Sequence, residues 1–217
     1  MSTSEQPVPR LERPEQVTTV LGLVTAGRFT LFDWLAADAA HAPDPGARIE
    51  LSRFAAAELA GHPELERAAA DHGAVLADVT APYLELFDAI GRRTVSTDWW
   101  ERMVRTTVAG GMVRDLVGLV VEHLADPGVA ADALAGRDLT DLVAEEVGRA
   151  TDADPRLAAR LALWGRRVAG EALGAVQPVL GVVASTSGTD LGALAAPALG
   201  AISAGHARRM ARLGLAA

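Results

Sequence analysis

A group of acidic and imidazole side chains stands at one-turn intervals in the second helical stretch of the sequence. Glu58, His62 and Glu66 follow each other at four-residue spacing, which places neighbours within ~40° of one another on a helix. Such a group can hold one metal ion or act as an acid and a base. The same spacing is also typical of ordinary charge pairing along a helix, worth about 0.2–0.5 kcal/mol per pair. The pattern favours ordinary pairing, with metal binding as the alternative.

An arginine in the first long helical stretch is the second feature that can carry chemistry. Arg28 falls within an apolar stripe made of Leu21, Val24, Leu31, Phe32 and Leu35. An arginine that faces a core needs an acidic partner, because an unpaired buried charge is costly and a guanidinium keeps its proton. The spacing predicts Glu58 as this partner, with Asp115 as a second candidate. The alternative is that Arg28 extends past the core and pairs at its rim.

Three smaller features have more ordinary interpretations. Asp38 and His41 have the spacing of metal ligands, but they end a helix, where a histidine can interact with the helix dipole. Trp99 and Trp100 are adjacent, so the sequence predicts that one of them points away from the core, toward a partner surface. The paired arginines at 166–167 and 208–209 are expected to be solvated or bound to acids.

Helical periodicity predicts the elements that must hold these side chains. The predicted helices cover residues 14–41, 46–72, 83–93, 96–124, 139–151, 155–185 and 190–215, with bends at Pro63, Pro178 and Pro197. Residues 74–82 are expected to be irregular, and 126–138 to hold at most a short turn of helix. Gly110 and Gly111 either weaken the third long helix or let another backbone approach closely. No segment alternates with period two, so no strand is predicted. The result is an all-α bundle of four long helices with additional helices.

Composition limits the function further. The chain of 217 residues suits one helical domain over residues 14–217, after a flexible lead-in at 1–13. Because cysteine is absent, disulfides, thiolate nucleophiles and cysteine-based metal sites are excluded, and a reducing cytoplasm is the expected location. The net charge of −8 disfavours nucleic acid as a partner. The most apolar run, 168–185, is interrupted by Glu171, Gln177 and Pro178, so no membrane segment is predicted.

Four blocks of the sequence resemble an actinobacterial family of ferritin-like proteins. This family is often described as similar to the tRNA hydroxylase that acts on 2-methylthio-isopentenyl-adenosine. The blocks are GRFTLFDWLAADAA (27–40), LSRFAAAELAGHPELERAAADHGA (51–74), DPRLAARLALWGRRVAGEAL (154–173) and HARRMARLGL (206–215). They follow one another over nearly the whole chain. The resemblance implies a ferritin-like four-helix bundle with additional helices.

The metal ligands that this resemblance implies are largely missing. A ferritin-like di-iron site takes a glutamate from each of two helices and a Glu-x-x-His pair from each of two others. The sequence contains no Glu-x-x-His. Arg28 stands where the first glutamate is expected, and Gly61 stands where a histidine would follow Glu58. The carboxylate of the third helix is replaced by Gly110 or Gly111, and residues 136–146 offer no histidine.

These departures predict a bundle that has lost its di-iron site. Arg28 would then supply the positive charge of the absent metals, and Glu58 and Asp115 would face it. We expect a non-catalytic binding or interaction protein that uses no cofactor. Its expected partners are a small hydrophobic ligand between the helices, a second copy of the chain, or another protein.

The alternative from the same residues is an enzyme. It would be a hydroxylase of the tRNA-hydroxylase-like group with an atypical di-iron site, in which Glu122, Glu145 or Glu146 replaces a missing ligand. A metal-independent activity would instead use Glu58, His62 and Asp115 as acids and bases. The sequence names no substrate for either.

Overall fold

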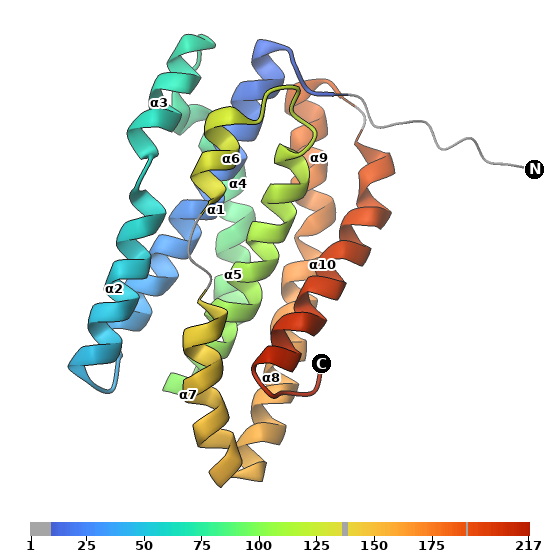
Figure 1. The fold of residues 1–217 in the computed structure, drawn as a ribbon. Coiled ribbons are helices and arrows are strands. Elements are labelled where there is room, and N and C mark those ends of the chain that lie inside the picture. Colours follow the sequence, from blue (N-terminus) through green and yellow to red (C-terminus); the bar gives the residue numbers. More distant parts are fainter. Residues whose placement is uncertain (1–9, 136–138, 190) are drawn as a thin grey trace, which may run out of the picture.

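The computed structural model describes residues 10–135, 139–189 and 191–217. Within these ranges the chain folds into helices that lie side by side in an elongated bundle (Figure 1). The helices are α1 (Pro14–Ala40), α2 (Pro45–Leu59), α3 (His62–Asp71), α4 (Leu76–Arg93), α5 (Trp99–Val121), α6 (Gly128–Leu134), α7 (Thr140–Ala153), α8 (Pro155–Gly174), α9 (Val176–Ser187) and α10 (Gly192–Arg212). The predicted all-α class is confirmed.

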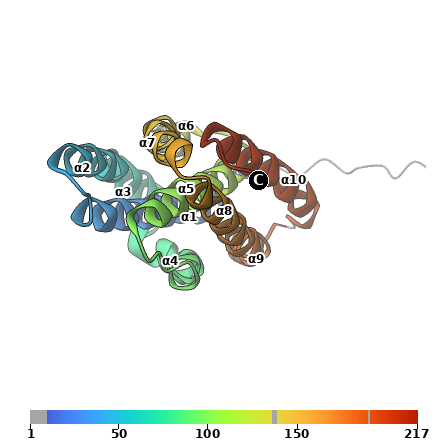
Figure 2. The ribbon, with the colours of Figure 1, turned by 90° about the horizontal axis from the view of Figure 1, so that it is seen from below.

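Helices α1 and α5 form the centre of the bundle. Figure 2 shows α2 and α4 beside α1, whereas α8 and α10 lie beside α5. Other helices surround α1, so its buried residues lie on most of its sides and not in one stripe. At Gly22 an added Cβ would lie 2.1 Å from the backbone oxygen of Val79, so only glycine permits this approach of α4. A close backbone approach, one of the two alternatives given for Gly110 and Gly111, is thus found at Gly22.

The predicted helix over 46–72 is two helices. Helix α2 ends at Leu59 and α3 begins at His62, and Gly61 between them has φ 81°. This left-handed conformation favours glycine and stops the helix before Pro63 is reached. Pro63 occupies the first turn of α3, where a proline is tolerated. The interruption thus comes from Gly61, and it frees the last carbonyl groups of α2.

Other boundaries also differ from the predicted ones. The segment 155–185 divides into α8 and α9 at Ala175, and Pro178 lies in the first turn of α9. Helix α4 includes Pro82, although residues up to 82 were expected to be irregular. Its buried residues Tyr83 and Phe87 belong to the core, and this packing outweighs the cost of an internal proline. The predicted last helix begins at residue 190, which lies outside the described residues.

The N-terminal end of the described chain is attached to the bundle. Leu11 is fully buried, and its backbone exchanges hydrogen bonds with the carbonyl of His123 at 2.8 Å and the N–H of Ala125 at 2.9 Å. Arg10 donates to the carbonyl of Glu122 at 2.8 Å. The flexible lead-in predicted for 1–13 is therefore wrong for residues 10–13, while residues 1–9 lie outside the described part of the chain.

Two stretches reach the length and apolarity of a membrane span, although the sequence pattern had indicated none. They are Pro14–Ala40 and Pro155–Ser187. In the first, 72% of the most apolar window is buried inside the protein, as expected for a core helix, and in the second 39% is buried. The two stretches meet this criterion by length and composition only, which is weak evidence for a membrane segment.

Candidate functional site

Arg28 extends from α1 to the C-terminal end of α2. Its Nε donates to the backbone oxygen of Glu58 at 2.6 Å, and its Nη2 donates to the backbone oxygens of Ala57 at 2.9 Å and Ala60 at 2.5 Å. Carbonyl groups in the last turn of a helix lack their usual helical partners and form the negative end of the helix dipole. The guanidinium therefore caps α2.

The acids predicted to face Arg28 bind other arginines. The carboxylate of Glu58 pairs with Arg114 of α5 at 2.5 Å, and Asp115 pairs with Arg209 of α10 at 2.6 Å. Arg28 is buried as predicted, at 8% exposure, but among the described residues no carboxylate lies within ion-pair distance of it. This corrects the predicted pairing: Arg28 contacts the backbone of Glu58, not its side chain.

The charge of Arg28 is held in an unfavourable environment. Burial lowers the pKa of its guanidinium, the negative charge of Glu58 raises it, and the positive charge of Arg114 lowers it further. Since a guanidinium does not lose its proton in proteins, the group stays charged. The carbonyl dipoles and the nearby Glu58 thus compensate the charge without a direct ion pair.

The row Glu58, His62 and Glu66 does not form one helical face. Glu58 belongs to α2 and the other two residues to α3, because the chain breaks at Gly61. His62 Nε2 lies 3.5 Å from Glu66 Oε1, and the imidazole packs against the ring of Phe29 at a centroid distance of 5.2 Å. Within the described ranges no three Asp, Glu or His side chains are grouped so that they could hold a metal ion. Ordinary pairing along a helix fits His62 and Glu66, whereas Glu58 pairs with Arg114.

Two cavities flank the Glu58–Arg114 pair. The larger has a volume of about 380 Å³ and lies between α1, α2, α3, α5 and α6. The smaller has a volume of about 190 Å³ and lies between α1, α2, α5 and α10. Leu31, Glu58 and Arg114 line both. Arg28 lines the larger cavity, whose remaining wall is mainly apolar and includes Val24, Val113, Val117, Val129 and Leu134.

Side chains, not a backbone, occupy the space beside Gly110 and Gly111. An added Cβ at Gly110 would lie 2.5 Å from Leu31 Cδ2, and one at Gly111 would lie 2.5 Å from Arg209 Nε. Arg209 thus fills the place where a carboxylate of the third helix was expected. Gly205 of α10 faces the carboxylate of Asp115 in the same way. The glycines on both helices make room for the Asp115–Arg209 pair.

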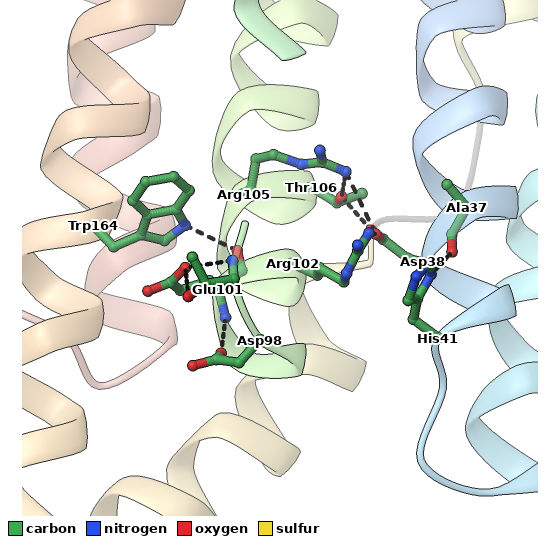
Figure 3. Close-up of polar contacts among 10 residues, drawn as sticks. Ala37, Asp38, His41, Asp98, Glu101, Arg102, Arg105, Thr106 and Trp164 are labelled. Carbon is green, nitrogen blue, oxygen red and sulfur yellow. Dashed lines mark hydrogen bonds and ion pairs between the residues drawn. The ribbon is translucent and has the colours of Figure 1, made fainter. Parts of the chain in front are cut away.

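A second buried ionic group, the Asp38 cluster, was not recognised from the sequence. Figure 3 shows Asp38 of α1 facing three residues of α5. Thr106 donates to its carboxylate at 2.5 Å, and Arg102 and Arg105 lie at 3.3 and 3.4 Å. Two arginines three residues apart in the apolar α5 stretch were the available signal. His41, in contrast, contacts the carbonyl of Ala37 at 2.8 Å at the end of α1, in the role predicted for it.

The tryptophans give less support to a partner surface than expected. Trp99 and Trp100 are both partly buried and packed against the core. Trp164 donates from its indole nitrogen to the carbonyl of Glu101 at 2.9 Å (Figure 3). Neither member of the adjacent pair is fully exposed, so the predicted outward-facing tryptophan is wrong.

The carboxylates proposed as replacement ligands lie elsewhere. Glu122 is exposed at the end of α5, and Glu145 pairs with Arg149 on the surface of α7. Burial raises the pKa of the Glu146 carboxyl, with Arg149 opposing. None of the three lines either cavity. They do not complete a ligand set around Glu58.

Comparison with known proteins agrees with this architecture. No curated protein matches the chain. A family model described as the ferritin-like domain of actinomycetes matches residues 12–188. The matched part contains α1 to α9, with Arg28, Glu58, Arg114 and Asp115. Because this family model matches most of the chain, and the chain folds as a helical bundle, the chain belongs to the family of actinomycete ferritin-like domains.

Proposed function

We propose that this chain is a non-catalytic binding protein on the ferritin fold, without a functional di-iron centre. Its ligand is a small, mainly apolar molecule that enters the larger cavity. The observation that carries the proposal is the cavity of about 380 Å³ beside Arg28 and the Glu58–Arg114 pair. Its volume lies in the ~300–1,000 Å³ range of ligand pockets, and its wall combines apolar side chains with a few polar groups.

The side chains of the interior support the loss of the metals. A di-iron centre of this fold needs several carboxylates and two histidines around it. Among the described residues beside the cavities, Glu58 and Asp115 are each bound to an arginine. A metal ion here would be repelled by the guanidinium groups of Arg28, Arg114 and Arg209. These residues do not fit a di-iron centre.

The competing proposal is a metal-dependent hydroxylase similar to the tRNA hydroxylase of 2-methylthio-isopentenyl-adenosine. It needs metal ions bound by an atypical ligand set, and none of the carboxylates discussed above supplies that set. Cytoplasmic location and homodimerisation are further proposals that come from the sequence.

Metal content separates the two proposals. The protein is expressed with iron and manganese supplied, purified without chelator or affinity tag, and analysed by mass spectrometry. We expect far less than one metal ion per chain in folded protein. Two metal ions per chain would overturn the proposed loss of the site and support the hydroxylase.

Ligand binding is tested with the neutral apolar fluorophore N-phenyl-1-naphthylamine. Val129 lines the cavity and is 37% exposed, whereas Val95 is 68% exposed and does not line it. We expect the parent and Val95→Trp to bind the fluorophore alike. Val129→Trp should weaken binding, because the indole enters the cavity. Equal binding by both variants would place the fluorophore elsewhere and contradict the proposal.

A further inference from the structure

We infer that the ligand of the larger cavity is an amphipathic anion. One carboxylate, or a group of similar charge, binds Arg28, and an apolar body fills the rest of the space. This inference rests on the proposed function, since it names the class of ligand for the same cavity.

One nitrogen of the Arg28 guanidinium, Nη1, remains available to a ligand. Its hydrogen bonds to the end of α2 use Nε and Nη2. Nη1 carries two further N–H groups, and it makes no hydrogen bond to any described residue. Because the other two nitrogens are held by fixed backbone oxygens, the orientation of Nη1 is set before a ligand arrives. A charged donor held in this way is suited to a carboxylate.

The other charged groups of the cavity wall already have compensation. Glu58 is bound to Arg114, and Glu64 is bound to Arg67 at 2.7 Å. Asp132 on α6 is exposed to solvent. Arg28 alone among the described charged residues of this wall is buried and has no ion-pair partner. An anionic group would form the direct ion pair that Arg28 lacks, whereas an amine would add to the positive charge near Arg28.

The backbone carbonyls bound to Arg28, and the nearby negative charge of Glu58 in the same cavity wall, limit where the anion can sit. The carbonyl oxygens of Ala57, Glu58 and Ala60 surround the Nε and Nη2 edge, so a carboxylate is repelled there. The Nη1 corner is the position left for it. The wall of the cavity that Arg28 lines is mainly apolar, with Val24, Val117 and Leu134 among its residues. One charge and an apolar body therefore match the cavity better than a polyanion or a sugar.

Three compounds with the same chain and different head groups test the charge. Decanoate, 1-decanol and decylamine displace N-phenyl-1-naphthylamine from the parent protein, each below its aggregation concentration. A hydrogen bond to a charged group corresponds to about tenfold or more in affinity. We expect decanoate to displace the fluorophore at a concentration at least about tenfold lower than 1-decanol, with decylamine the weakest.

Two variants then assign the effect to Arg28. Arg28→Gln should remove the advantage of decanoate and leave 1-decanol nearly unchanged, while Arg28→Lys, which keeps the charge, should retain part of it. If Arg28→Gln does not fold, the comparison of the three compounds on the parent still decides. Equal displacement by decanoate and 1-decanol, or stronger displacement by decylamine, would overturn the inference while leaving the proposed function intact. A fluorophore that does not bind, or that binds Val129→Trp normally, would overturn the proposed function itself.

Discussion

Two buried charges ten residues apart on α1 are compensated in different ways. Asp38 is 0% exposed, and charged or hydrogen-bonding side chains of α5 surround its carboxylate. The guanidinium of Arg105 also lies over the ring of Trp34 at 5.1 Å. Arg28 is 8% exposed and contacts backbone carbonyls, next to a cavity of about 380 Å³. Asp38 lines neither cavity.

The difference shows what each arrangement is suited for. Where side chains of opposite charge face each other, the charge of the carboxylate is compensated directly and the surrounding residues can close around it. Carbonyl dipoles on one edge of a guanidinium leave the other edge and its charge available. The Asp38 cluster is therefore interpreted as structural, and Arg28 as a binding group.

The largest effect is expected at Asp38. Asp38→Ala leaves Arg102 and Arg105 without their buried acid, and it should lower the free energy of unfolding by about 3–5 kcal/mol in chemical denaturation. The exposed Asp33 of the same helix provides the control, because Asp33→Ala should change stability by about 0.5 kcal/mol or less. If the two variants were equally stable, the Asp38 cluster would not have the structural role assigned to it.

A smaller loss is expected at Arg28. Arg28→Met keeps an unbranched apolar stem and removes the guanidinium with its hydrogen bonds to the end of α2. The freed carbonyls face a cavity that water can enter, so the free energy of unfolding should fall by about 1–3 kcal/mol. A loss as large as that of Asp38→Ala would contradict the distinction between the two charges.

Double-mutant cycles sharpen the assignment of partners. The cycle of Arg114→Met and Glu58→Gln should give a coupling of about 1–2 kcal/mol, because these side chains form an ion pair. The cycle of Arg28→Met and Glu58→Gln should give about 0.5 kcal/mol, since Arg28 contacts only the backbone of Glu58. The reverse order would restore the pairing that the sequence predicted.

The smallest effect concerns pH. Burial, and then the charge of Arg209, lowers the pKa of His206 on α10 below its usual value of about 6.5. The unfolded chain therefore binds the proton more readily, and this residue makes the protein less stable as pH falls from about 6.5 through the lowered pKa. His206→Gln should reduce this slope in denaturation at several pH values.

Arg28→Met is the control for the pH experiment. It should keep the slope of the parent, because a guanidinium does not titrate in this range. An unchanged slope in His206→Gln would show that other groups cause the acid sensitivity.

Several features of the fold and the site could be predicted from the sequence. The helical class followed from periodicity, and the burial of Arg28 followed from its place in an apolar stripe. The break at Gly61 was missed, and only a bend at Pro63 was expected, because the sequence does not show that Gly61 adopts φ 81°. The pairing of Glu58 with Arg114 was missed, since an arginine side chain can reach several acceptors and the spacing along one helix does not rank them.

The sequence by itself determined the helices and the kinds of charge available inside the bundle, because periodicity and residue type are local properties. Only the tertiary structure decided which charges meet. Arg209 binds Asp115 across 94 residues, and the end of α2 offers its carbonyls to Arg28 on α1. The cavity is also a tertiary property, since it is the space that α1, α2, α3, α5 and α6 leave between them.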